Sequence, residues 1–267
     1  MKTAIKLYSR IRKMVSFFVK RLKLDRFRKV KGRKLALSLE GIVSLGLFKQ
    51  RNNIATKKAL YEIFEPKCSY KTMVVTMNRF CVLGLLILIN LLKNNRDNQH
   101  IIKHIDSTDI PVCLFKNANA HKTMRGLSSF GRNSKGTFFG LKMHIISDLK
   151  RQILAIKFTP ANTDDRAVVI GLAKDMEGIF VADAGYISEK LGKQFYRRFK
   201  RILVAKPRAN MKKIMTKFEE NLYRTRMLIE INFRNLKMFY GLVTSLPRSI
   251  DGYLANYIYS LLAYQIA

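Results

Sequence analysis

The spacing of apolar residues divides this chain into a helical first part and a second part in which strands and helices alternate. Between Ser38 and Asn94 apolar side chains recur every three to four residues, which is the period of one helix face. Ser38 and Ser69 each precede an apolar run, where a serine can cap a helix, and Pro66 interrupts the pattern. The predicted helices span residues 38–49, 54–64 and 70–93.

Beyond Gln99 the pattern changes to short apolar runs rich in β-branched and aromatic residues. The predicted strands span residues 100–108, 136–147, 152–159, 178–183 and 201–205, and the predicted helices 164–175, 189–199 and about 210–240. Two of these strands close on a carboxylate, the first on Asp106 and the fourth on Asp183. The order strand, hairpin, helix, strand, helix, strand, helix predicts an α/β fold with parallel and antiparallel pairing. We place the domain boundary between residues 1–98 and 99–267.

The charge balance changes this picture by pointing to a polyanionic partner. The chain carries 51 Lys and Arg against 18 Asp and Glu, a net charge of +33, and such an excess repels itself in a compact protein. DNA or RNA phosphates suit it best, with a basic membrane-surface protein as the competing interpretation. Residues 1–34 contain fourteen basic residues and one acid. We therefore predict that region 1–98 is a DNA-binding module; the alternative is a helical brace on the second domain.

Cysteine usage and apolar runs exclude several other classes. Cys68, Cys81 and Cys113 show no Cys-x-x-Cys spacing and form no zinc pattern with the four histidines. We interpret them as reduced thiols of a cytosolic protein. Residues 1–23 lack the apolar core of a secretory signal. The run 81–92 is shorter than the roughly twenty residues of a membrane span, so we expect a buried helix and no membrane partner.

The predicted helix at about 210–240 places four polar side chains on one face. Tyr223, Arg226, Glu230 and Lys237 follow one another at intervals of three, four and seven residues, and at about 100° per residue these steps return to nearly the same side. A carboxylate among cations has two interpretations. It is either part of an ion pair with Arg226 or Arg234, or one ligand of a site that handles metal and phosphate.

The second interpretation requires partner carboxylates, and the predicted strand ends supply them. Ligand sites in α/β sheets lie where strands end and loops begin, so Asp106, Asp183 and Glu230 converge if the two strands are neighbours and the helix packs across them. Carboxylates brought together repel one another unless a cation lies between them, and Mg²⁺ suits oxygen ligands. Asp109 competes with Asp106 for the first position, and each carboxylate could instead belong to a turn, a cap or an ion pair.

Five segments together resemble the bacterial insertion-sequence transposases of the DDE type. The pattern Tyr-x2-Arg-x3-Glu-x6-Lys formed by residues 223–237 resembles their signature helix. The other four are, in chain order, Asp106-Ser-Thr, Gly140-Leu-Lys142-Met-His144, Ala161-Asn-Thr-Asp-Asp165 and Asp183-Ala-Gly-Tyr186.

This resemblance implies a ribonuclease H-like fold, with a mixed sheet flanked by helices behind a small helical N-terminal region. It implies divalent-metal-dependent strand cleavage and strand transfer at inverted-repeat ends, with Asp106, Asp183 and Glu230 as catalytic and metal-binding residues. Mg²⁺ is the expected cofactor, and Mn²⁺ could substitute. The expected DNA contacts come from Tyr223, Arg226, Lys237 and Lys142.

The resemblance also sets the expected partners. These are double-stranded DNA, in the form of element ends and target, and further copies of the chain on that DNA, in a bacterial cytoplasm close to the nucleoid. Two alternatives stay open: a decayed relative that binds DNA without cleaving it, and a metal-dependent nuclease without strand transfer. Strand 136–147, which carries Lys142 and His144, is expected to run beside the strand of Asp106.

Overall fold

A computed structural model describes residues 2–27, 34–134, 136–199, 201–207, 211 and 214–266. The chain divides into two compact units, a helical unit of Met1–Leu91 with Asn235–Ala267 and a sheet unit of Leu92–Arg234. The unit that contains most of the predicted N-terminal region thus also contains the C-terminal helix. A DNA-binding role for residues 1–98 stays a prediction.

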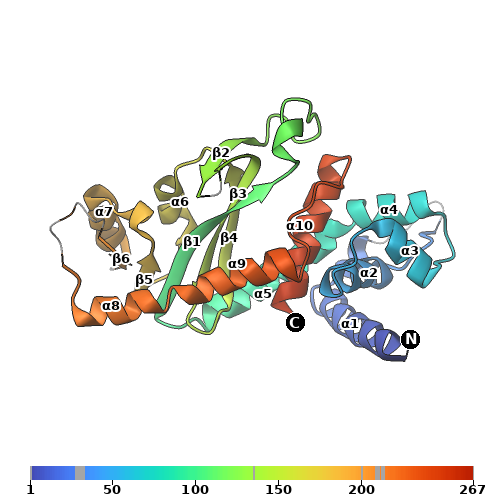
Figure 1. Cartoon of the computed structure of the whole chain (residues 1–267). Coiled ribbons are helices and arrows are strands. Elements are labelled where there is room, and N and C mark those ends of the chain that lie inside the picture. Colours follow the sequence, from blue (N-terminus) through green and yellow to red (C-terminus); the bar gives the residue numbers. More distant parts are fainter. Residues whose placement is uncertain are drawn as a thin grey trace. The chain divides into compact units, whose positions relative to one another are not determined.

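The helical unit is built from segments whose ends carry hydroxyl caps. It contains α1 (Lys2–Arg21), a 3-10 turn (Leu24–Phe27), α2 (Leu39–Arg51), α3 (Lys57–Phe64), α4 (Tyr70–Arg79), the larger part of α5 (Cys81–Asp97) and α10 (Ile250–Gln265) (Figure 1). Ser38 and Ser69 cap α2 and α4, as predicted. The single helix predicted at 70–93 is instead two, because the chain turns at Phe80. Helix α1 was not predicted.

A buried tyrosine joins three helices of this unit. The hydroxyl of Tyr259 in α10 donates to the carbonyl oxygen of Met77 in α4 at 3.1 Å. Its ring lies against Gly46 of α2, where an added Cβ would be only 2.7 Å from the ring atoms. Glycine at position 46 therefore allows the close approach of α10 to α2.

Helices α4 and α5 also meet a simple test for a membrane span. By length and composition alone, Tyr70–Asp97 is apolar enough to cross a membrane. This is weak evidence, since core helices of soluble proteins share these properties, and α4 packs against α2 and α10. The absence of a membrane partner stays a prediction.

The sheet unit has one mixed sheet of six strands. The strands are β1 (Ile102–Pro111), β2 (Ser129–Asn133), β3 (Gly136–Asp148), β4 (Ile153–Pro160), β5 (Ile179–Ala182) and β6 (Ile202–Ala205). They run in the order β2-β3-β1-β5-β6, and β4 also pairs with β3. Strand β3 pairs antiparallel with β1 and with β4, to which the predicted hairpin joins it; β5 pairs parallel with β1, and β6 pairs parallel with β5. The predicted strands are thus confirmed, and β2 is an addition.

Helices cover both faces of this sheet. The remaining elements are a 3-10 turn (Phe115–Asn117), α6 (Asp165–Leu172), a 3-10 turn (Ala184–Tyr186), α7 (Glu189–Phe199), α8 (Lys217–Arg224) and α9 (Met227–Met238). Phe180 of β5 faces a core shared with α6 and α7, whereas its neighbour Val181 packs with Leu222 of α8. Successive residues of a strand point to opposite faces, so one face of the sheet belongs to α6 and α7 and the other to α8 (Figure 1).

Candidate active site

The two predicted aspartates lie at one edge of the sheet and on one face. Strands β1 and β5 pair in parallel up to His104 and Val181, and Asp106 and Asp183 each lie two residues further along. Two residues return a strand to the same face, and Val181 faces α8. Asp106 and Asp183 therefore project side by side on the α8 side, where β5 has ended and the flank of β1 is open.

Strand β1 continues past the end that the sequence predicted. The first strand was expected to end in Asp106, but β1 runs to Pro111, because its other edge stays paired with β3 as far as Pro111 and Gly140. A Cβ at Gly140 would lie 2.2 Å from the carbonyl oxygen of Ile110. Glycine here permits the close pairing of β1 and β3. The site thus opens along the flank of a strand, beside the end of its neighbour.

Arg226 connects the aspartate edge to Glu230. One guanidinium nitrogen lies 3.4 Å from Asp106 Oδ2, and the other forms a short ion pair with Glu230 Oε1 in the first turn of α9. The side chains of Arg226 and Asp106 are each 15% exposed, and that of Glu230 is 58% exposed. One cation therefore bridges two of the three predicted carboxylates at the rim of the site.

Burial and crowding by negative charge alter the ionisation of Asp106. The pKa of Asp106 is raised to about 7, chiefly by burial and to a smaller extent by the nearby carboxylates of Asp183 and Asp165, against the opposing effects of Arg226 and the Ser107 N–H. A carboxylate in this position is stabilised in its charged form by any additional cation.

A second polar cluster lies on the opposite face of β1. Asp165, in the first turn of α6, accepts a hydrogen bond from Ser107 Oγ at 3.0 Å and pairs with Lys142 Nζ at 3.0 Å. Lys142 also donates to the carbonyl oxygen of Thr163. The sequence indicated Asp165 only as part of a motif, and its ion pair with Lys142 was not foreseen. The sequence feature that could have indicated a role for Asp165 is its position in the first turn of the predicted helix 164–175.

The predicted long helix is two helices. Residues 210, 212 and 213 of that prediction lie outside the described residues. Thr216 and Glu219 form a capping box that starts α8 at Lys217. Between α8 and α9, Thr225 Oγ1 donates to the carbonyl oxygen of Leu222 at 2.7 Å and lies 2.8 Å from His104 Nε2. Here the backbone N–H groups of Thr225, Arg226, Leu228 and Ile229 donate to carbonyl oxygens three residues back, and these tighter turns interrupt the α-helix.

Of the four residues that the sequence had placed on one stripe, Arg226 and Glu230 stay together as an ion pair, whereas Tyr223 and Lys237 lie in different helices. Tyr223 lies in α8, with Lys206 over its ring at 6.0 Å and the β5–β6 apolar cluster beside it. Arg226 lies in the turn, and Lys237 lies in the last turn of α9, in the part of that helix that belongs to the helical unit. Arg226 and Lys142 are engaged by carboxylates within the sheet unit. Contact of these four residues with DNA stays a prediction.

The three predicted carboxylates have the oxygen ligands that a divalent ion prefers, but in this structure they do not form a complete metal-binding site. Among the residues that the structure describes, no group of three His, Cys, Asp or Glu side chains is close enough to hold an ion. The donor set of three carboxylates consists of hard oxygen atoms, which Mg²⁺ prefers. The raised pKa of Asp106 and the bridging position of Arg226 both mark a place where positive charge is stabilising.

Comparisons with known proteins show the family and the fold of this chain. No curated protein matches the chain. The cryo-EM structure of the piggyBac transposase synaptic complex with hairpin DNA is similar to 97% of this chain and 71% of its own, with a TM-score of 0.54 and 10% sequence identity. The Mos1 transposase paired-end complex gives 85% and 77% coverage at 12% identity, but its TM-score of 0.26 is too low to support an argument.

The piggyBac likeness confirms the predicted fold class, a ribonuclease H-like mixed sheet flanked by helices with a helical N-terminal region. Residues 96–250 match the family described as the transposase DDE domain. These residues include Asp106, Asp183 and Glu230. Since the match covers more than half of the chain, this protein belongs to the transposase DDE domain family.

Proposed function

We propose that this transposase cleaves DNA at the inverted-repeat ends of a mobile element and joins those ends to target DNA. The observation that carries the proposal is the shared edge and face of Asp106 and Asp183, together with the Arg226 bridge from Asp106 to Glu230. These three carboxylates would hold Mg²⁺, or Mn²⁺ in its place. When bound, the ion would stabilise the charge that develops on the phosphodiester during an in-line displacement.

The geometry favours Asp106 over Asp109 as the first carboxylate. Asp109 lies three residues further along β1 and pairs with Lys142 of β3. An odd separation turns a side chain to the other face of a strand, so Asp109 faces the side of Lys142 and α6. Asp106 alone of the two shares a face with Asp183.

Arg226 has a positioning role in this proposal. Its guanidinium contacts both Asp106 and Glu230, which lie on separate elements. Positive charge between two carboxylates offsets their repulsion and limits their separation. His104 holds Thr225, the residue before Arg226, against β1. The bond from His104 thereby fixes the start of α9 relative to the aspartates.

The net charge of +33 supports DNA as the substrate. Tyr223, Arg226, Lys237 and Lys142 are proposed DNA contacts. In this structure the cations of Arg226 and Lys142 are paired with carboxylates. Both side chains would therefore have to leave these carboxylates to contact DNA phosphates. Assembly of several copies on DNA, in the cytoplasm close to the nucleoid, belongs to the same proposal.

Incubation of the full chain with labelled element-end duplexes and Mg²⁺ or Mn²⁺ tests the function. We expect nicked and joined products. Asp183→Asn and Glu230→Gln are expected to lower cleavage at least a hundredfold and to change DNA affinity less than threefold. Asp106→Asn should be inactive, while the matched variant Asp109→Asn should stay active.

Other results of these assays would each contradict a part of the proposal. Cleavage without joined products would indicate a nuclease. Binding without cleavage by the wild type would indicate a decayed relative. Full activity of Asp106→Asn with loss in Asp109→Asn would overturn the assignment of the first carboxylate.

A further inference from the structure

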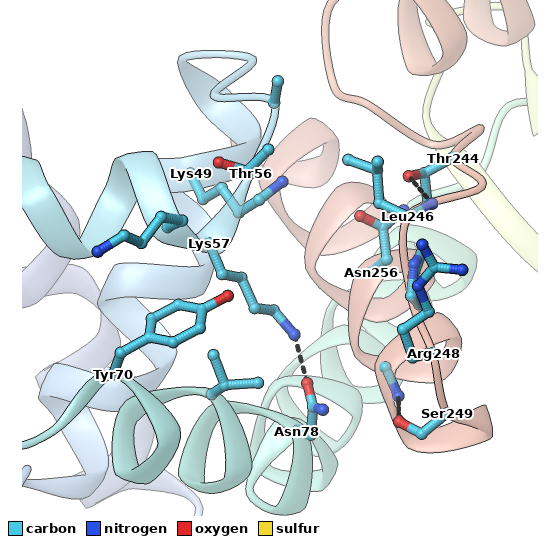
Figure 2. A pocket seen from close by; sticks show the side chains of 15 residues that line it. Lys49, Thr56, Lys57, Tyr70, Asn78, Thr244, Leu246, Arg248, Ser249 and Asn256 are labelled. Atoms are coloured by element: carbon cyan, nitrogen blue, oxygen red, sulfur yellow. Dashed lines mark hydrogen bonds between the residues drawn. The ribbon is translucent and has the colours of Figure 1, made fainter.

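The helical unit contains a basic cavity, whereas the three predicted carboxylates belong to the sheet unit. Its volume is about 450 Å³, and its wall comes from the end of α2, the start of α3, α4, the segment 244–249 and α10. Figure 2 shows Lys49, Lys57 and Tyr70 on one side and Arg248 with Ser249 on the other. All of these residues belong to one compact unit.

The described lining carries positive charge and no negative charge. Lys49, Lys57, Lys58 and Arg248 line the cavity, and no Asp or Glu is among the lining residues that the structure describes. Lys58 is exposed and pairs with Glu62 outside the cavity at 3.4 Å. The cavity therefore holds an excess of cations that are not matched by its own wall.

The two inner lysines have neutral partners. Lys57 donates to Asn78 Oδ1, and Lys49 donates to Gln50 Oε1 at 3.1 Å (Figure 2 shows the first bond). Within the described part of the chain, neither ammonium forms an ion pair. Burial lowers the pKa of both to about 8, and the charge of Lys57 adds to the effect on Lys49. Both ammonium groups are thus partly dehydrated without a counter-ion, and an anion between them would offset that cost.

Two helix starts add to the positive potential. Thr56 caps α3 and Ser249 caps α10, and both residues line the cavity. The N-terminus of a helix carries a partial positive charge of about half a unit, which favours anions. Tyr70, whose side chain is 40% exposed, adds an aromatic face beside these cations. A nucleotide base can stack on such a face while its phosphate meets the lysines.

We propose that the cavity bounded by Lys49, Lys57 and Arg248 binds a phosphate group. The phosphate comes either from the DNA backbone or from free phosphate. Only the first source rests on the proposed function. Lys49 and Lys57 contact the anion from one wall, and Arg248 contacts it from the opposite wall. The N-termini of α3 and α10 add positive electrostatic potential.

Binding by the full chain, without divalent metal, tests this proposal. The variant Lys49→Gln/Lys57→Gln is compared with Lys67→Gln/Lys71→Gln, which removes the same charge from exposed positions outside the cavity. Fluorescence anisotropy measures affinity for labelled duplex DNA, and calorimetry measures inorganic phosphate. We expect the cavity variant to lose at least tenfold in affinity and the control less than threefold. For duplex DNA the slope of log K against log salt should fall by about 0.9 per lost phosphate contact.

The two probes distinguish the sources. A selective loss for duplex DNA assigns the phosphate to the backbone, and a selective loss for inorganic phosphate alone assigns a small anion. Equal affinities of cavity and control variants for both probes overturn the proposal. Arg248→Gln, at an exposed position, gives a second test in case Lys57→Gln unfolds the chain, and it should lose at least threefold. Because no cleavage is measured, a failure of the proposed catalysis leaves this result unaffected.

Discussion

Replacement of His144 by glutamine should make the protein more resistant to acid. His144 in β3 is 1% exposed, and its Nε2 lies 2.8 Å from Thr159 Oγ1. Burial lowers the pKa of His144 to about 4, and Lys142 and Lys157 contribute, against the opposing charge of Asp165. The folded protein therefore keeps this imidazole neutral at a pH where an exposed histidine would be charged.

The sign and size of the effect follow from proton binding. Between pH 6.5 and 4 the unfolded chain takes up a proton at His144 that the folded chain does not, so stability falls as the pH falls through this window. From an unfolded pKa of 6.5 and a folded pKa of about 4, the loss between pH 7.5 and 4.5 is about 2.5 kcal/mol. Glutamine can keep a hydrogen bond to Thr159 and does not titrate.

Urea unfolding of the wild type and His144→Gln, followed by circular dichroism at pH 7.5 and 4.5, measures this difference. We expect the wild type to lose about 2.5 kcal/mol more than the variant over that interval. His104 titrates in both proteins and cancels in the comparison. Equal losses would show that His144 is not held neutral. Retention of DNA cleavage by His144→Gln at pH 7.5 would assign this motif histidine to the fold, and loss of cleavage in a folded variant would contradict that role.

Three other substitutions probe the fold around the site. Lys103 is buried, and burial lowers its pKa to about 8, so its deprotonation should add up to about 3 kcal/mol of stability between pH 8 and 10.5. In urea unfolding, Lys103→Met should show a rise smaller than that of the wild type by this amount, because Lys49 and Lys57 titrate in both proteins. Gly140→Ala places a Cβ 2.2 Å from the Ile110 carbonyl oxygen and should destabilise by about 2 kcal/mol or more, so an unchanged unfolding midpoint would refute the close approach. Thr225→Val removes the bonds to His104 and Leu222 and should reduce cleavage tenfold or more with less than threefold change in DNA affinity; reduced binding with normal turnover would contradict a role in positioning α9.

The elements of this protein were largely determined by local sequence. The serine caps of α2 and α4, the β3–β4 hairpin and the strands that carry Asp106 and Asp183 were all predicted, because their signals lie within a few residues. The order of those elements also determined the mixed α/β class. The motif pattern also indicated the transposase family.

The arrangement of the site depended on contacts between distant segments. Strand β1 passes through Asp106 because β3 pairs with it to Pro111, and this pairing confirms the expectation, drawn from the family resemblance, that strand 136–147 runs beside the strand of Asp106. Thr225, in the break between α8 and α9, hydrogen-bonds to a histidine of β1 that is far away in the sequence. The spacing of residues did not predict this break.

By itself, the sequence determined which residues carry charge and most of the elements that they occupy, although it placed Tyr223 and Arg226 in one helix with Glu230. Only the tertiary structure decided that Asp106 and Asp183 share a face that Asp109 does not, and that Arg226 bridges Asp106 to Glu230. It also placed lysines from separate helices around one cavity. The physical reason is that helix capping and turn formation act within a few residues, whereas strand pairing, ion pairs and burial depend on distances in space that the packing of the chain sets.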